Sequence, residues 1–114
     1  MAAEAVLDER AGVFEALADP TRRWMIERLA RVGSTTPTAL AGELPISRQA
    51  VSRHLGVLQE GGLVTVRKEG REQHYQLAVD PLRDAADWIA RIEQTWDHRL
   101  AALGALLAEE PESD

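Results

Sequence analysis

The sequence predicts a small, mainly α-helical fold that carries one β-hairpin, and three observations within residues 40–77 point to it. A short helical stretch is followed by a tight turn at Pro45-Ile46, after which a second helix begins. That second helix has an apolar side and a polar side, as a surface helix does. A basic segment with alternating apolar residues, typical of a hairpin, follows directly. This is the order of parts in a winged helix-turn-helix, which lays one helix in the DNA major groove.

The length and composition fit one intracellular domain. A chain of 114 residues suffices for one core but not for two, so we expect a single domain over residues 1–114. No apolar run approaches the length of a membrane span, and the N-terminus lacks the pattern of a secretory signal. The chain has no cysteine, which excludes disulfides and thiolate metal ligands. We expect a cytoplasmic protein with no membrane partner.

The net charge of −6 is unevenly distributed along the chain. Residues 45–77 carry five bases against three acids, whereas residues 78–114 carry nine acids against three bases. DNA binding responds to local charge and not to the total of the chain. The small basic surplus therefore lies where the DNA-reading parts are expected, and it predicts moderate affinity with marked salt sensitivity.

Two helices are expected before the helix-turn-helix. The first, in the N-terminal segment 1–18, covers residues 6–17. The second begins at Asp19-Pro20, because aspartate is a good N-cap and proline fits the first helical position. It ends at Gly33-Ser34. Its expected buried stripe consists of Trp24, Met25, Ile26, Leu29 and Val32.

The helix-turn-helix is expected over residues 36–60. Thr36-Pro37 opens its short first helix, and Ser47 caps the second helix through its hydroxyl. Gly61-Gly62 stops the second helix. The core side of the unit is expected to carry Leu40, Ala41, Leu44, Val51, Leu55 and Leu58.

The outward side of the second helix carries side chains suited to reading DNA. Arginine can donate two bonds to guanine, and glutamine pairs with adenine. The expected contacts from this helix are Ser47, Arg48, Gln49, Ser52, Arg53 and His54. His54 is the weakest of them, since it lies near the core side, where packing or hydrogen bonding against the second helix is slightly favoured over a phosphate contact. An ordinary solvated face would carry the same residue types, but the turn before it and the basic hairpin after it favour DNA contact.

A hairpin wing is expected over residues 63–78, with its reversal at residues 69–71. Arg67, Lys68 and Arg71 cluster at its tip, where cations can lie beside the DNA backbone or enter the minor groove. We expect at least one of them, first of all Arg71, to contact DNA. The alternative is that these charges protect exposed strand edges from aggregation. His74 is expected to be a solvated strand residue.

A long C-terminal helix is expected over residues 81–109, and its apolar stripe predicts a two-fold homodimer. A compact monomer of this size could hardly cover a stripe with two tryptophans. The expected interface residues are Leu82, Trp88, Ile89, Ile92, Trp96, Leu100 and Leu103. Such a pair also sets two reading helices roughly 34 Å apart. The alternative is that the stripe packs wholly inside its own chain.

These motifs together resemble the ArsR/SmtB family of bacterial winged-helix repressors. The resemblance covers roughly residues 13–107 and rests on ALADPTRRWMIERL and on ISRQAVSRHLGVLQEGGLVTVRKEGREQHYQL. It implies a dimer with a five-helix core and a winged hairpin, acting by occlusion of an operator in double-stranded DNA. The family's recognition-helix positions correspond here to Ser47, Arg48, Gln49, Ser52, Arg53 and His54.

The chain departs from the family's metal sensors. Many members bind metal through a cysteine pair on the first helix of the helix-turn-helix, where this chain reads ALAGEL. Others use Asp and His ligands on the last helix, which here offers Asp87, Asp97 and His98 without a second histidine. A tight zinc or soft-metal site needs several converging N or S donors. We therefore expect no metal and no cofactor.

Other functions rank below a sequence-specific DNA-binding regulator. A winged-helix module that binds protein has no need to keep both the wing and the helix face cationic. An enzyme ranks last, because no nucleophile–base set, phosphate-binding glycine loop or metal motif is present. A small-molecule inducer stays open, since Trp24, Trp88 and Trp96 could line a pocket, although such aromatics are more often core or interface. The operator, the regulated genes and the sign of regulation cannot be read from the sequence.

Overall fold

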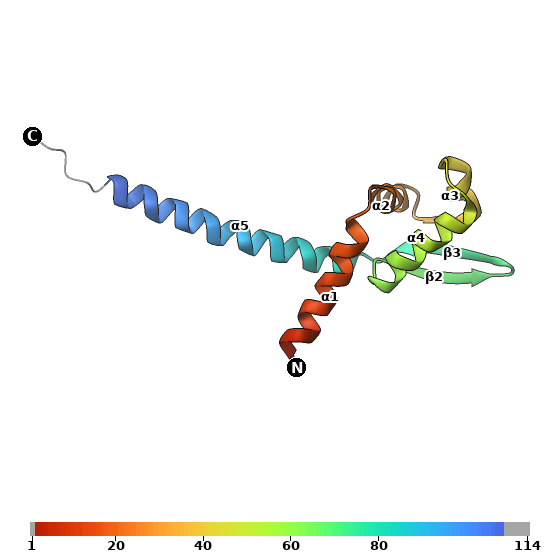
Figure 1. Cartoon of the computed structure of the whole chain (residues 1–114), viewed down its shortest axis with the longest axis horizontal. Coiled ribbons are helices and arrows are strands. Elements are labelled where there is room, and N and C mark those ends of the chain that lie inside the picture. Colours follow the sequence, from red (N-terminus) through yellow and green to blue (C-terminus); the bar gives the residue numbers. More distant parts are fainter. Residues whose placement is uncertain (1, 109–114) are drawn as a thin grey trace, which may run out of the picture. The chain divides into compact units, whose positions relative to one another are not determined.

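The computed structural model describes residues 2–108, with side chains from Arg10 onward. In chain order (Figure 1) the elements are α1 (Ala2–Leu17), α2 (Pro20–Val32), β1 (Ser34–Thr35), α3 (Pro37–Glu43), α4 (Arg48–Glu60), β2 (Val64–Glu69), β3 (Glu72–Leu77) and α5 (Val79–Ala108). This mostly helical chain with an antiparallel wing confirms the predicted fold class. Helix α5 begins two residues earlier than expected, and its predicted end at residue 109 lies outside the described residues.

The chain divides into two compact units. The first, residues 1–83, holds the first four helices and the sheet. The second, residues 84–114, holds most of α5. Among the described residues, no helix is both long enough and apolar enough to cross a bilayer.

Side-chain caps fix where three helices of the first unit begin. A carboxylate oxygen of Asp19 accepts a bond from the Arg22 backbone N–H at 3.0 Å. The hydroxyls of Thr36 and Ser47 accept bonds from the third residue of α3 and α4, each at 3.1 Å. Each cap satisfies an amide that has no partner within its helix. The predicted caps at Asp19 and Ser47 are confirmed.

The core of the first unit lies where α2, α3, α4 and the strands meet. Its largest fully buried side chains are Met25, Leu29, Leu40, Val51, Leu55, Leu58 and Leu63. The predicted core side of α4 is therefore confirmed. The predicted stripe of α2 is wrong at Val32, which is 44% exposed, because α2 ends there and the chain turns away at Gly33 with a φ of 87°. Trp24 is only half-buried.

The sheet has three antiparallel strands in the order β1-β3-β2, and not only the two of the predicted hairpin. Strand β1 pairs Ser34 with Gln76 and Thr35 with Tyr75. Strands β2 and β3 pair from Val64–Leu77 at the base to Glu69–Glu72 at the tip. Gly70 makes the reversal with a φ of 60°, which favours glycine. The two residues of β1 are too short to show strand alternation in the sequence.

Candidate nucleic-acid interface

Helix α4 is held by one face and presents the other to solvent. Val51, Leu55 and Leu58 are fully buried, and they lie at i, i+4 and i+7 on one side of the helix. The opposite side carries exposed side chains that together line one open depression: Arg48, Gln49, Ser52 and Arg53. One side of the helix thus packs in the core while these four side chains remain accessible.

The Ser47 hydroxyl can form two hydrogen bonds at the start of α4. Its hydroxyl oxygen accepts the bond from Ala50, and Ser47 itself is exposed. A hydroxyl that accepts one bond can still donate its proton. Ser47 can therefore cap the helix and donate a hydrogen bond outward at the same time.

The basic residues of the wing differ in their surroundings. The Arg67 guanidinium forms an ion pair with Glu69 at 3.0 Å, on the same strand. Lys68 and Arg71 are exposed and form no ion pair with any described residue. Among the three predicted wing contacts, Lys68 and Arg71 therefore carry a positive charge that no described carboxylate neutralises, unlike Arg67.

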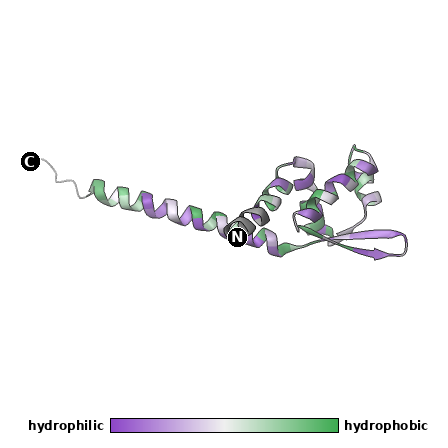
Figure 2. Ribbon diagram, turned by 60° about the horizontal axis from the view of Figure 1, so that its bottom comes forward, coloured by the Kyte–Doolittle hydropathy of each residue, from purple (hydrophilic) through white to green (hydrophobic). Residues whose placement is uncertain are grey.

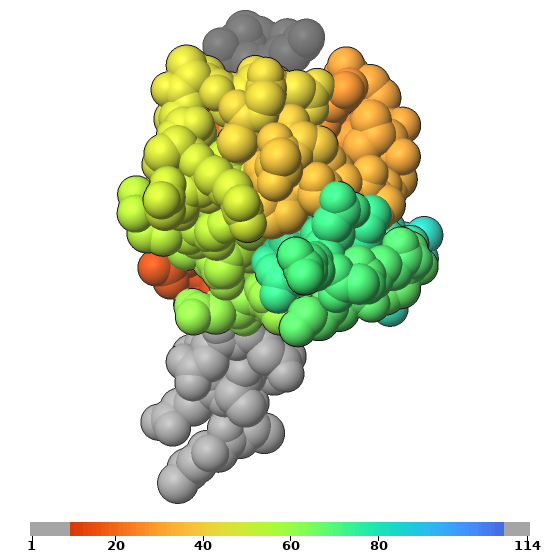
Figure 3. Space-filling view, turned by 90° about the vertical axis from the view of Figure 1, so that its right-hand side faces the viewer, coloured from red at the N-terminus to blue at the C-terminus, as the bar shows by residue number. Residues whose placement is uncertain are grey.

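A cleft of about 470 Å³ separates the wing tip from the start of α3. Figure 3 shows this face, with the wing beside α3 and the beginning of α4. The cleft brings together cations from two predicted groups, Arg48 of α4 with Lys68 and Arg71 of the wing. Its full lining is Thr36, Pro37, Thr38, Arg48, Lys68, Arg71, Glu72 and Gln73.

Sequence reasoning missed the polar residues of this cleft. Thr36, Thr38 and Gln73 line the cleft but are not among the contacts expected from the sequence, where Thr36 has a role only at the start of a helix. No pattern in the sequence places residues 36–38 opposite residues 71–73. The antiparallel contact of β1 with β3 makes this arrangement, and β1 itself gives no sequence signal.

Comparison with known proteins identifies the family. A family model described as a helix-turn-helix domain matches residues 17–67. The chain is 41% identical over 97 residues to the HTH-type transcriptional regulator Rv2034 of Mycobacterium tuberculosis, covering 85% of this chain and 87% of that protein. It is 30% identical to the transcriptional repressor SdpR of Bacillus subtilis, covering 77% and 97% respectively.

Solved structures that resemble this chain indicate the same family as these relatives. An ArsR-like transcriptional regulator from Rhodococcus sp. RHA1 matches with a TM-score of 0.83 at 38% identity, covering 94% of this chain and 97% of that chain. The homodimeric winged helix-turn-helix DNA-binding domain of Mb0332 from Mycobacterium bovis, described as a possible ArsR-family regulator, matches with a TM-score of 0.63 at 33% identity, covering 85% and 86%. The chain belongs to the ArsR family of transcriptional regulators. The resemblance seen in its motifs is confirmed, and the family is one of DNA-binding regulators and not of enzymes.

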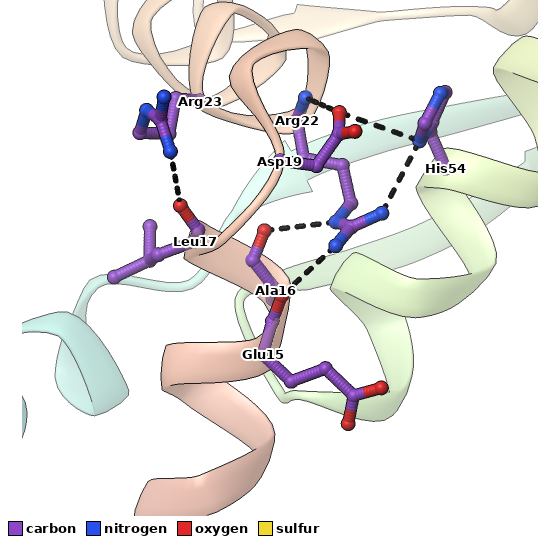
Figure 4. A network of polar contacts seen from close by, with 7 residues as sticks. All are labelled: Glu15, Ala16, Leu17, Asp19, Arg22, Arg23 and His54. Carbon is purple, nitrogen blue, oxygen red and sulfur yellow. Dashed lines mark hydrogen bonds and ion pairs between the residues drawn. The ribbon is translucent and has the colours of Figure 1, made fainter.

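In this ArsR-family regulator, His54 turns toward the body of the protein. Its Nδ1 lies 3.4 Å from the guanidinium of Arg22 on α2 and 3.8 Å from the carboxylate of Asp19, the N-cap residue of α2. Figure 4 shows the ring directed at this pair. This position fits the packing and hydrogen-bonding alternative for His54, so we do not count it among the proposed DNA contacts.

His74 departs from its prediction as a solvated strand residue. Its side chain is only 24% exposed, and its Nε2 lies 3.3 Å from Glu72 and 3.5 Å from Glu69. The register explains this, because His74 stands opposite Arg67 while Glu69 and Glu72 face each other two positions nearer the tip, on the same face of the ribbon. The wing therefore holds its own cluster of polar side chains, which Arg67, Glu69, Glu72 and His74 form.

Helix α5 of the ArsR-family chain carries the predicted apolar stripe on an exposed surface. Ile89, Ile92, Trp96, Leu100 and Leu103 are between 44% and 60% exposed. Figure 2 shows apolar residues alternating with polar ones along this helix. Two further residues predicted for the interface, Leu82 and Trp88, are half-buried.

Potential metal ligands are dispersed, and not clustered, in the described part of the chain. Within it, no group of three or more His, Cys, Asp or Glu side chains is placed to bind an ion. Asp87, Asp97 and His98 of α5 are all exposed. The donor set that zinc prefers is therefore not assembled by the described residues of this chain.

Proposed function

We propose that this ArsR-family regulator is a homodimeric, metal-independent repressor that binds a two-fold-related operator in double-stranded DNA through α4 and the wing. The observation that carries the proposal is the accessible cationic surface formed by the outward face of α4 and the adjacent cleft. Relatives named as repressors and a homodimeric structural neighbour support it. The proposed location is the cytoplasm, where an operator in DNA would be accessible to the protein.

In this function α4 lies in the major groove. Arg48 and Arg53 are exposed, and neither forms an ion pair with a described residue. A free guanidinium can donate two bonds to guanine O6 and N7, while Gln49 matches adenine N6 and N7. Ser47 and Ser52 are small donors suited to phosphate or to an adaptable base contact.

The cleft beside the wing suits one sugar-phosphate strand. Arg48, Lys68 and Arg71 supply positive charge from its opposite walls, and Thr38 adds a hydroxyl. Such contacts fix the register of a protein on the duplex without reading its sequence. In the proposed complex Lys68 and Arg71 carry the main wing contact with DNA, and Arg67 contributes less because Glu69 neutralises part of its charge.

The spacing of the α5 stripe suits pairing with a second copy of the same helix. Ile92 and Leu100 lie four residues on either side of Trp96, and Ile89 and Leu103 lie seven. Two antiparallel copies related by a two-fold axis at Trp96 place each apolar residue opposite an apolar residue of the partner. Isologous pairing of this kind is the commonest route to a closed dimer.

The competing function is a winged-helix module that binds a protein and not DNA. The unpaired cations on both sides of the cleft favour DNA, because a protein-docking surface does not require positive charge on α4 and on the wing together. A small-molecule inducer site lined by Trp24, Trp88 and Trp96 stays a prediction from the sequence.

A selection experiment tests the proposed function. The protein is used to select duplexes from a randomised library, and the enriched sequence is then measured by titration against a scrambled duplex of the same length. We expect an inverted-repeat sequence and one dimer bound per site. A correctly folded protein that enriches no sequence would refute the proposal and favour the protein-binding module.

A further inference from the structure

The Arg22 side chain joins the end of α1 to the start of α2. Its Nε donates to the Ala16 carbonyl at 2.8 Å, and its Nη2 donates to the Glu15 carbonyl at 2.8 Å. Carbonyls in the last turn of a helix lack partners within the helix. The planar guanidinium, with its fixed donors, bonds both carbonyls at once, and the Glu15 carbonyl also accepts from the Ala18 backbone N–H at 3.1 Å.

The third edge of the same guanidinium faces the DNA-reading helix. Its Nη1 lies 3.4 Å from Nδ1 of His54 on α4, and the Asp19 carboxylate lies 3.8 Å from that nitrogen (Figure 4). Arg22 and His54 are 32 residues apart in the chain. One side chain therefore touches α1, belongs to α2 and contacts α4.

Helix α1 meets α4 at a second place, where the two backbones nearly touch. A Cβ built on Gly61 would lie 2.8 Å from the Gly12 carbonyl oxygen and 3.4 Å from the Ala16 Cβ. Gly61 follows the last residue of α4 and has an ordinary φ of −75°, so its need for glycine comes from the close approach and not from its backbone angle. This contact lies seven residues beyond His54, about 10 Å along a helix that rises 1.5 Å per residue.

We infer that Arg22 is a positioning residue for DNA reading, which sets the tilt of α4 through His54 while the Gly12–Gly61 contact holds the far end of the helix. A helix attached at two points keeps its direction. Arg53 adjoins His54 in the chain and points outward, so a change in tilt at His54 displaces the side chains that read bases. This inference rests on the proposed function and names a residue that touches no DNA.

The test compares three substitutions on the same turn of α2. Arg22→Gln removes the bridge, and Arg22→Lys keeps the charge but has one nitrogen that cannot reach both carbonyls and the imidazole. Arg23→Gln is the matched control, because Arg23 also donates to an α1 carbonyl, that of Leu17 at 2.7 Å, without reaching α4. Each protein is titrated with the duplex selected by the wild type and with a scrambled duplex, well below its melting temperature.

We expect both Arg22 variants to lose about tenfold in affinity for the selected duplex, comparable to the loss of one good base contact. Affinity for the scrambled duplex should stay within twofold of wild type, roughly, because phosphate contacts tolerate small displacements. Arg23→Gln should resemble the wild type on both duplexes. Full rescue by Arg22→Lys, or equal losses in Arg22→Gln and Arg23→Gln, would overturn the inference.

Two further measurements keep the inference decidable. If Arg22→Gln does not fold, His54→Leu removes the other end of the bridge and should show the same loss of affinity for the selected duplex. Wild-type affinity in this variant would overturn the inference.

Backbone amide spectra without DNA provide the second readout. Arg22 variants should shift resonances throughout α4, whereas Arg23→Gln should shift only those near Leu17. If the wild type selects no duplex, the proposed function fails, and the spectra alone decide whether Arg22 positions α4.

Discussion

The Arg67 guanidinium lies 3.0 Å from the Glu69 carboxylate, and both side chains project from the same strand of the wing. Residues two apart on a strand share a face, which makes this pairing possible. Both side chains are more than half exposed, so the pair is screened and contributes little to stability. Its consequence is for DNA binding, because it distinguishes Arg67 from the unpaired Lys68 and Arg71.

Replacing Arg71 with alanine should reduce the salt dependence of DNA binding. Each phosphate contact releases about one counterion, so the slope of log affinity against log salt should become shallower by about one. Arg67→Ala is the control at the same hairpin and should change the slope less, since Glu69 already neutralises part of that charge. Titration over a salt series measures both. An unchanged slope for Arg71→Ala would remove it from the DNA contacts.

Replacing Arg53 with alanine should weaken binding to the selected operator far more than binding to scrambled DNA. Loss of a two-bond contact with guanine costs about 1–3 kcal/mol of discrimination. Arg31→Ala removes an exposed arginine of α2 and serves as the charge-matched control. Equal losses on the two duplexes would show that Arg53 contacts only phosphate.

Replacing Trp96 with aspartate should disrupt the dimer, because it puts a charge at the proposed two-fold axis of the α5 stripe. Trp96 is 60% exposed in the single chain. Gln94→Asp introduces the same charge on the opposite side of α5 and should leave the dimer intact. Sedimentation equilibrium gives the dissociation constants. An undisturbed dimer in Trp96→Asp would place the interface elsewhere.

Replacing Gly61 with alanine should destabilise the protein, because the new Cβ would lie 2.8 Å from the Gly12 backbone oxygen. Overpacking of this kind costs about 1–3 kcal/mol of unfolding free energy. Gly42→Ala is the control, since a Cβ there meets nothing within 4 Å and the change within helix α3 should be neutral or stabilising by up to about 1 kcal/mol. Chemical denaturation compares the three proteins, and matching destabilisation in both variants would contradict the close contact.

The Asp19 carboxylate should make the free energy of unfolding depend on pH in the acid range. The hydrogen bond from the Arg22 backbone N–H lowers the pKa of Asp19 below its ordinary 3.8, and partial burial opposes this while the charges of His54 and Arg22 add to the lowering. A lowered folded-state pKa means that the stabilisation is fully present above the unfolded value and is lost as the pH falls through the folded value. Asp19→Asn keeps a capping oxygen but cannot titrate.

Urea unfolding of wild type and Asp19→Asn over a pH series tests this relation. The wild type should be the more stable protein near neutrality. The difference in unfolding free energy between the two proteins should decrease as the pH falls below 3.8. A gap that does not change with pH would show that the charge of Asp19 does not contribute.

Much of the fold follows from local chemistry in the sequence. The caps at Asp19 and Ser47 and the apolar spacing of Val51, Leu55 and Leu58 depend only on residues within two turns. The hairpin is similarly local, because Gly70 lies between two short alternating stretches. These features could be predicted correctly because each depends on residues that are close together in the sequence.

The features that escaped prediction depend on contacts distant in sequence. Strand β1 exists only because β3 lies beside it, and the polar residues of the cleft follow from that pairing. The bridge from Arg22 to His54 spans 32 residues and has no periodic signal. Exposure at Val32 likewise depends on where α2 ends and not on its spacing.

Strand β1 supports the wing at one end only. It pairs with Tyr75 and Gln76, near the base, while residues 67–74 are hydrogen-bonded only within the hairpin. A two-stranded ribbon that is held at its root bends more easily than a three-stranded sheet. In the proposed complex, bending of the outer half of the wing would let Lys68 and Arg71 adjust to the sugar-phosphate strand while α4 keeps its position in the major groove.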